Sequence, residues 1–197
     1  MLILASASPR RQELLRSAGI EFKVHPTDIP EVPQAGEPPV ACAQRLAQEK
    51  AEAIAAQYPG DVILGADTIV VVDREMLGKP RDAADAARML RLLSGRAHEV
   101  ITGVCLLGTQ PAGSGGSPFT DTRAETTKVV MDPLTEQDIA LYVASGEPMD
   151  KAGAYAIQGI ASRWISRIEG DYSTVVGLPV AVVYRMLVAH RINLASG

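Results

Sequence analysis

The feature that most constrains the fold is a long apolar run near the middle of the chain, residues 61–73, which reads DVILGADTIVVVD. The run is rich in β-branched residues, and it predicts a strand that is buried on both faces. Asp67 interrupts it, and an isolated carboxylate is very costly to bury. We therefore expect Asp67 to meet a metal, a cation or a water-filled cleft, and we favour a functional role over that of a hydrogen-bonded core aspartate. Gly65 would allow a ligand to approach the backbone closely, and Thr68 adds a neighbouring hydroxyl.

The first sixteen residues predict a second functional element. An apolar strand over residues 2–5 leads into a helix that Ser8 caps and that Pro9 opens. Arg10 and Arg11 fall in the first helical turn, where the macrodipole makes each of them unfavourable by roughly 0.3–1 kcal/mol. This arrangement is a sensible cradle for a polyphosphate, because helix N-termini and arginine side chains both bind phosphate oxygens. The alternative is that both arginines are solvated surface residues.

Composition limits the function classes. The 197 residues carry a net charge of −4, so the surface offers no general attraction for nucleic acid or for an anionic membrane, and any anion site must be local. The length fits one sizeable domain or two small lobes. The two cysteines, Cys42 and Cys105, lack metal-type spacing and suggest reduced thiols. With no secretory signal and no long apolar run, we expect a cytoplasmic protein without a membrane partner.

The remaining pattern alternates helices and strands and predicts an α/β fold. Helices are expected over residues 9–18, 40–57, 82–93, 134–144 and 177–190, and shorter strands over residues 21–25 and 163–168. Residues 98–108 and 121–131 are predicted to pair as a hairpin in a mixed sheet, joined by a Gly/Ser/Pro loop over residues 109–118.

Four further residues are candidates, each with a simpler alternative. Glu31 lies in a proline-rich loop over residues 26–39 and is a solvated acid unless this loop folds back over the cradle. Lys50 is an ordinary helix-surface lysine unless its face points at the phosphate site. Lys79, between a glycine and a proline, projects from a constrained backbone, although most lysines are simply solvated. Gln158 lies in a loop over residues 150–159. Its amide is able to hydrogen-bond to the edge of a nucleotide base, and the alternative is an ordinary surface glutamine.

These segments, taken together, resemble the Maf family of nucleoside triphosphate pyrophosphatases nearly from end to end. The motifs that carry the resemblance are LASASPRR at 4–11, GADT at 65–68, LGKP at 77–80, SG at 94–95 with His98, TGV at 102–104, DKAGAY at 150–155 and GLP at 177–179. Each motif is weak alone, but their order along the chain is specific.

The resemblance implies a fold similar to that of the inosine triphosphate pyrophosphatases, with two lobes, a long mixed sheet and a cleft between the lobes. It implies cleavage between the α- and β-phosphates with a divalent cation such as Mg²⁺ or Mn²⁺. Residues 154–159 are similar to the branch that acts on dTTP and UTP, which makes pyrimidine triphosphates, modified ones included, the expected substrates. A homodimer is implied as well. The alternative is a nucleotide-binding regulator of septum formation in which hydrolysis is weak or incidental.

The resemblance also assigns roles to the candidate residues. Asp67 would accept the proton of the attacking water, bind the metal, or do both, and Glu31 would be a second metal contact. Arg10, Thr68 and Gln158 would tune substrate choice. The residues themselves suggest the remaining roles: Arg10, Arg11 and the helix N-terminus that Ser8 caps would hold the triphosphate, and Lys79, with Lys50 as a further candidate, would neutralise the leaving pyrophosphate.

Overall fold

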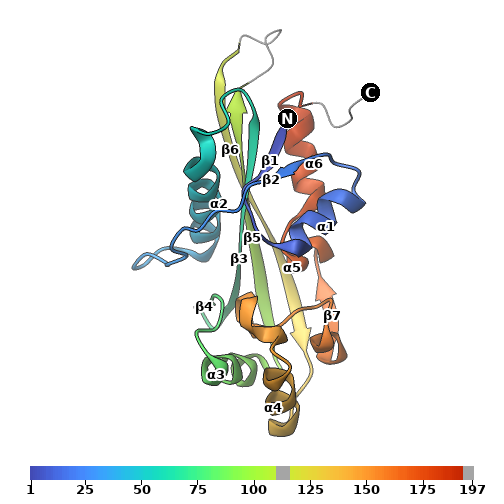
Figure 1. Cartoon of the computed structure of the whole chain (residues 1–197). Coiled ribbons are helices and arrows are strands. Elements are labelled where there is room, and N and C mark those ends of the chain that lie inside the picture. Colours follow the sequence, from blue (N-terminus) through green and yellow to red (C-terminus); the bar gives the residue numbers. More distant parts are fainter. Residues whose placement is uncertain (110–115, 193–197) are drawn as a thin grey trace. The chain divides into compact units, whose positions relative to one another are not determined.

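The computed structural model describes residues 1–109 and 116–192. These residues form a mixed seven-stranded sheet in the order β2-β1-β3-β5-β6-β7, with β4 paired to β3, and helices flank it (Figure 1). The α/β class is therefore confirmed, whereas most of the loop expected over residues 109–118 lies outside the described residues. The strands are β1 (Leu2–Leu4), β2 (Lys23–Val24), β3 (Val62–Val72), β4 (Glu75–Leu77), β5 (Ala97–Thr109), β6 (Pro118–Met131) and β7 (Ile165–Glu169).

The helices agree with the expected ranges to within a few residues at each end. They are α1 (Pro9–Ser17), α2 (Pro39–Ala55), α3 (Ala83–Leu93), α4 (Glu136–Ala144), α5 (Tyr172–Val176) and α6 (Val180–Ala189), with the 3₁₀ helices η2 (Glu147–Asp150), η3 (Ala152–Ala154) and η4 (Ile160–Trp164). The short α5 and the strand β4 were not expected from the sequence. Both are too short to show a clear hydrophobic period. Within the described residues, no helix has both the length and the apolarity needed to cross a bilayer.

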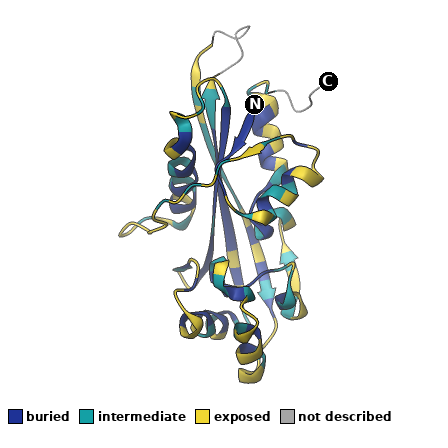
Figure 2. Ribbon diagram, viewed as in Figure 1, coloured by how far each residue is buried: buried dark blue, intermediate teal, exposed yellow. Residues whose placement is uncertain are grey.

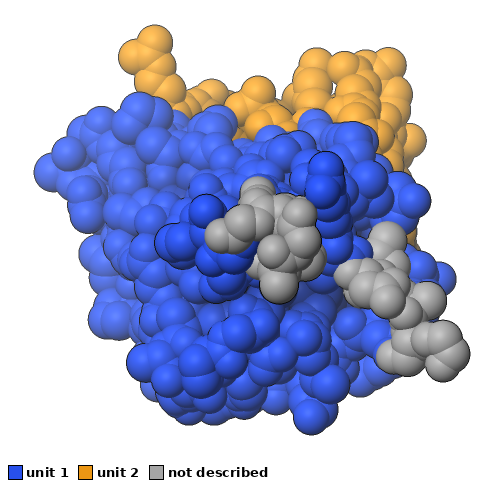
Figure 3. Space-filling model, turned by 90° about the horizontal axis from the view of Figure 1, so that it is seen from above, with its two compact units in different colours: residues 1–67, 102–125, 177–197 blue, residues 68–101, 126–176 orange. Residues whose placement is uncertain are grey.

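The chain divides into two compact units (Figure 3). The first comprises Met1–Asp67, Thr102–Glu125 and Gly177–Gly197, and the second comprises Thr68–Ile101 and Thr126–Val176. Three strands, β3, β5 and β6, contribute residues to both units. Asp67 is therefore the last β3 residue of the first unit, and Thr68 is the first β3 residue of the second.

Strand β3 is the buried centre that the sequence predicted. All eleven of its residues are buried except the half-buried Thr68 (Figure 2). In the first unit, its even-numbered residues such as Leu64 pack in one core cluster with residues of α1 and α6. Its odd-numbered Ile63 packs in another cluster, with Ala47 and Ala51 of α2. Asp67 continues the odd-numbered series, so it belongs to the sheet face that α2 covers.

Glycine lets α2 lie unusually close to this sheet face. A Cβ atom on Gly65 would stand 2.0 Å from the backbone oxygen of Ala47, and one on Gly103 of β5 would stand 2.2 Å from the backbone oxygen of Ala43. The expectation that Gly65 admits a ligand is therefore wrong, because the α2 backbone fills that space. The same close approach brings the inner face of α2, including Lys50, down to β3.

The N-terminal segment also forms as the sequence predicted. Strand β1 pairs in parallel with both β2 and β3, with Leu4 opposite Leu64. Helix α1 begins at Pro9, and its N-cap Ser8 accepts a hydrogen bond from the backbone N–H of Arg11. Gly19, with a φ of 66°, follows the C-cap, as the predicted helix end requires.

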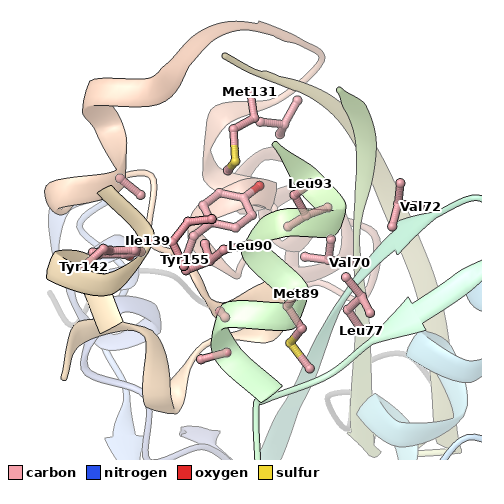
Figure 4. Packing of buried hydrophobic residues seen from close by; sticks show 14 of the residues in the cluster. Val70, Val72, Leu77, Met89, Leu90, Leu93, Met131, Ile139, Tyr142 and Tyr155 are labelled. Carbon is pink, nitrogen blue, oxygen red and sulfur yellow. The ribbon is translucent and has the colours of Figure 1, made fainter. Parts of the chain in front are cut away.

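The second unit has a hydrophobic core of its own (Figure 4). Side chains from β3 and β4, such as Val70 and Leu77, pack there with Leu90 of α3 and Tyr142 of α4. Gly153, with a φ of 68°, presses against Val70, which a Cβ atom would approach to 2.8 Å. This tight packing fixes the start of the segment that leads to Gln158.

Candidate active site

Asp67 lies in a buried cluster of charges in the first unit. The Lys50 Nζ atom donates to Asp67 Oδ1 at 2.6 Å and to Glu31 Oε1 at 2.8 Å. The side chains of Lys50 and Asp67 are 7% and 5% exposed, and that of Glu31 is 32% exposed. One ammonium group thus joins a carboxylate on a central strand to a carboxylate on the proline-rich loop.

The simpler alternative of a helix-surface lysine is therefore wrong for Lys50. Lys50 shares the inner face of α2 with Ala47, Ala51 and Ile54, at the spacing of one helical stripe. It points at the sheet because Gly65 lets the helix approach. Glu31 stays exposed, but its loop folds back onto α2, where it pairs with Lys50.

Arg11 is buried and firmly held. Its side chain donates from Nε to the backbone oxygen of Gly177 at 2.8 Å and from Nη1 to Ser6 Oγ at 3.1 Å. Only 9% of the residue is exposed, so the alternative of a solvated surface arginine is wrong for Arg11. The Ser6 hydroxyl also accepts the backbone N–H of Ser8, at 3.2 Å. Ser6 thus ties this guanidinium to the turn that starts α1.

Arg10 and Ser8 complete the N-terminal part of the site. Both are half-buried, at the start of α1. The first turn of α1 contains no acidic residue that would offset the positive end of the helix dipole. The arrangement is therefore chemically suited to hold an anion.

Electrostatics link these groups. Burial raises the pKa of Asp67, while the positive charges of Lys50 and Arg11 act in the opposite direction. Burial likewise lowers the pKa of Arg11, against the fields of Asp67 and Glu31. With Arg10 included, three cationic side chains face two carboxylates, which leaves a positive balance inside a protein that is negative overall. Such a site attracts polyanions locally, and a carboxylate with a raised pKa is a better proton acceptor.

Three sequence candidates belong to the second unit. Thr68 is half-buried on β3, and Lys79 is exposed between β4 and α3. Gln158 is exposed in the turn between η3 and η4. The structure joins Asp67 to Lys50, Glu31 and Arg11 through contacts or electrostatic interactions within the first unit.

The turn that carries Gln158 is held on both sides. The backbone N–H of Ala156 donates to the Tyr142 hydroxyl at 3.2 Å, and that of Ile160 donates to Glu147 Oε1 at 3.0 Å. The Tyr142 hydroxyl in turn donates to Glu147 Oε1 at 2.8 Å. Gln158 therefore projects from a restrained backbone.

Sequence reasoning gave no role to Ser6, Glu37 or Arg45. Ser6 lies within a recognised motif, but its contact with Arg11 depends on how the strand turns into α1. The Arg45 Nε and Nη2 atoms donate to the two carboxylate oxygens of Glu37, each at 2.7 Å. This pair joins a loop to a helix across eight residues, and neither helical nor strand periodicity signals such a contact.

The donor set suits a cation that the substrate helps to coordinate. In the described parts of the chain, no group of three or more His, Cys, Asp or Glu side chains is placed to hold a metal ion. Asp67 and Glu31 nevertheless already share one cation, the Lys50 ammonium. Mg²⁺ commonly uses one or two protein carboxylates and completes its shell with substrate phosphates and water. The residues therefore fit Mg²⁺ in the presence of a polyphosphate.

Comparison with known proteins gives relatives along nearly the whole chain. A protein named dTTP/UTP pyrophosphatase from Koribacter versatilis is 58% identical over 94% of this chain and 92% of its own. Proteins of the same name from Geobacter sulfurreducens and Syntrophomonas wolfei are 54% and 48% identical, covering 92% and 97% of this chain and 92% and 98% of theirs.

A solved structure, that of the Staphylococcus aureus Ham1 protein, is similar with a TM-score of 0.43 and 14% identity, over 66% of this chain and 71% of that one. A likeness at this level supports no conclusion about this chain. The family model described as Maf-like protein matches residues 1–190. Because this model covers almost the whole chain, and because relatives that are 58% and 54% identical match it over nearly its full length, the chain belongs to the family of Maf-like proteins.

Proposed function

We propose that this protein is a nucleoside triphosphate pyrophosphatase that hydrolyses dTTP and UTP to the nucleoside monophosphate and pyrophosphate. The observation that carries the proposal is the buried Asp67 carboxylate, held by Lys50 and lying in the field of Arg11. Relatives named dTTP/UTP pyrophosphatase support the choice of substrates. The activity would remove unwanted nucleotides, modified pyrimidines among them, before nucleic-acid synthesis in the cytoplasm.

In this proposal Arg10, Arg11 and the N-terminus of α1 hold the triphosphate. A water oxygen attacks the α-phosphorus while its proton passes to the Asp67 carboxylate. The bond between the α-phosphorus and the oxygen that bridges to the β-phosphate breaks, and that oxygen leaves with pyrophosphate. Lys50 and Lys79 neutralise the charge of the leaving group. Preorganised charges act more strongly where they are buried, as Lys50 and Arg11 are.

We propose Mg²⁺ or Mn²⁺ as the cofactor, held by Asp67 and Glu31. When bound, such an ion neutralises phosphate charge and polarises the phosphoryl oxygens. The support is the pair of carboxylates that already share the Lys50 ammonium. Chelation of the divalent cation is expected to abolish turnover.

Base selection is assigned to Arg10, Thr68 and Gln158. Gln158 is exposed on a restrained turn, and an amide both donates and accepts hydrogen bonds, as reading a pyrimidine edge requires. The alternative of a nucleotide-binding regulator of septum formation has no observation in its favour. A pure binder gains nothing from a buried carboxylate facing a polyanion.

The test is a panel of nucleoside triphosphates incubated with the purified protein and Mg²⁺ in ¹⁸O-labelled water. We expect dTTP and UTP to be hydrolysed fastest, with pyrophosphate as product and the label in the nucleoside monophosphate. Release of inorganic phosphate and a nucleoside diphosphate would contradict the proposed bond cleavage. Tight nucleotide binding without any turnover would favour the regulator instead.

A further inference from the structure

The segment that carries Glu31 has little structure of its own to hold it in place. Residues 26–38, which we call the strap, connect β2 to α2 and contain neither helix nor strand. Four of the thirteen residues are prolines, which cannot donate backbone hydrogen bonds. Val32, next to Glu31, is 65% exposed. Because ordering each residue costs about 1–2 kcal/mol of conformational entropy, contacts outside the strap must hold it.

Besides Lys50, which binds Glu31, and the Ala5 backbone oxygen, which accepts from Thr27, Arg45 of α2 supplies such contacts. Its guanidinium binds both carboxylate oxygens of Glu37, each at 2.7 Å, and Nη2 also donates to the backbone oxygen of Val32 at 3.1 Å. A single side chain thus holds the strap at the residue directly after Glu31 and again near the end of the strap. Planar, two-point pairing of this kind is specific to arginine.

Glu37 also closes a turn within the strap. Its Oε2 atom accepts the backbone N–H of Gln34 at 3.1 Å, and its own backbone N–H donates to the Gln34 oxygen at 3.1 Å. The Glu37 side chain is only 10% exposed, and its hydrogen bonds with Arg45 lower its pKa to about 2. The ion pair therefore persists throughout the neutral pH range.

We propose that Arg45, through Glu37 and the Val32 carbonyl, is the positioning residue that fixes Glu31 against Lys50 and so completes the acidic pair with Asp67. Arg45 and Lys50 lie five residues apart on one helix, so a rigid element sets both ends of this arrangement. The inference rests on the proposed function, in which Glu31 and Asp67 hold the divalent cation. It adds that the site depends on a residue that touches neither the cation nor the nucleotide.

The first test measures the strap itself, without nucleotide. Arg45→Gln keeps a polar side chain but shortens it and removes the guanidinium fork, and Glu37→Gln removes the charge that the fork binds. We expect both variants to speed hydrogen–deuterium exchange in peptides covering residues 31–38. The matched control is Glu49→Gln, because Glu49 accepts a hydrogen bond from Arg45 Nη1 at 2.9 Å but does not belong to the strap. Unchanged exchange in both strap variants would overturn the inference, whatever the nucleotide assays give.

The second test asks whether Arg45 acts through Glu31. Loss of an outer-shell partner of a metal ligand typically costs about 10–100-fold in metal affinity or activity. We expect a change of this order in the Mg²⁺ concentration that half-saturates dTTP hydrolysis in Arg45→Gln and in Glu37→Gln. The Glu49→Gln control should stay within about twofold of the parent, since an ion pair four residues apart on one helix contributes little.

A double-mutant cycle separates positioning from a general loss of structure. In a Glu31→Gln background, Arg45→Gln should have no further effect on the Mg²⁺ requirement, because the group that it positions is already gone. Effects that multiply independently would overturn the inference while leaving the pyrophosphatase proposal intact. A Glu31→Gln variant with the parental Mg²⁺ requirement would also overturn it. A parent protein that hydrolyses neither dTTP nor UTP would instead refute the proposed function, and the exchange experiment would still decide whether Arg45 holds the strap.

Discussion

Lys50 is the residue on which the balance of the buried charges depends. Its ammonium contacts both Asp67 and Glu31, and no more than 7% of its side chain is exposed. Removing one partner of a buried ion pair leaves the other charge without compensation, which is commonly more damaging than replacing both partners. Lys50 therefore supports folding and is proposed to serve the reaction as well.

We expect Lys50→Met to lower the free energy of unfolding by about 3 kcal/mol, because Asp67 is then buried without its cation. Urea denaturation at neutral pH measures the change. Lys128→Met is a suitable control, since Lys128 lies 3.8 Å from its partner Glu169 and its side chain is 48% exposed. That control should change stability by no more than about 0.5 kcal/mol. If the parent and Lys50→Met have equal free energies of unfolding, Lys50 and Asp67 do not form a buried charge pair.

His98 makes the stability of the second unit depend on pH. It is 3% exposed, its Nε2 atom lies 2.7 Å from the Tyr155 hydroxyl oxygen, and burial lowers its pKa from 6.5 to about 4. Above pH 6.5 the imidazole is neutral in both folded and unfolded chains. As the pH falls from 6.5 towards 4, the unfolded chain takes up a proton that the folded chain refuses, so stability is lost across this window.

The difference in unfolding free energy between the parent and His98→Gln should shrink by about 3 kcal/mol as the pH falls from 7 to 4. Urea denaturation at a series of pH values gives this difference curve. Tyr155→Phe is the control, because it removes the hydrogen-bonding hydroxyl but leaves the imidazole buried, and it should retain the pH dependence of the parent. A difference curve that does not change with pH would contradict the burial of a neutral His98.

Helix α2 is the element that assembles the site. It lies over Gly65 and Gly103, it points Lys50 at Asp67, and through Arg45 it holds the strap. Its amphipathic pattern predicted a helix with an inner face containing Ala47. The pattern could not place Lys50 on that face, because a lysine in an amphipathic pattern indicates solvent. Only the depth at which the helix packs, which the missing Cβ atom of Gly65 allows, brings the ammonium to β3.

Features that depend on neighbouring residues could be predicted from the sequence, and contacts between distant segments could not. The buried strand β3 and the capped start of α1 were predictable because each depends on neighbouring residues. The contacts of Arg11 with Gly177 and of Arg45 with Glu37 were not, since they join segments that no local pattern relates. The roles of Thr68, Lys79 and Gln158 in substrate binding stay predictions.

Gly65→Ala is expected to destabilise the protein by about 3 kcal/mol or more, because its Cβ atom would collide with the α2 backbone at 2.0 Å. Thermal or urea unfolding measures the loss. Gly78→Ala is the matched control, since a Cβ atom there meets nothing within 4 Å and its φ does not lie in the left-handed region. If the two variants are equally stable, α2 does not pack on β3 as described.

At the scale of the whole molecule, the sequence carries a negative net charge, while the first unit gathers Lys50 and Arg11 around the buried Asp67 and the exposed Glu31. Strands β3, β5 and β6 run through both units, so the two have no simple boundary in the sequence. Relatives cover nearly the full length of the chain, so the likeness extends over both units. The homodimer implied by the family resemblance stays a prediction that sedimentation would test.

The most direct measurement is pyrophosphate release from dTTP and UTP by Asp67→Asn, compared with Asp73→Asn. Asp73 directly follows the same strand, but it is exposed and has a φ of 48°, a conformation that asparagine tolerates well. We predict that Asp67→Asn folds and loses about 10²–10⁴-fold in kcat, the range typical of a lost general base, while Asp73→Asn keeps the parental rate. A folded Asp67→Asn variant with undiminished, metal-dependent turnover would contradict the central role given to this carboxylate.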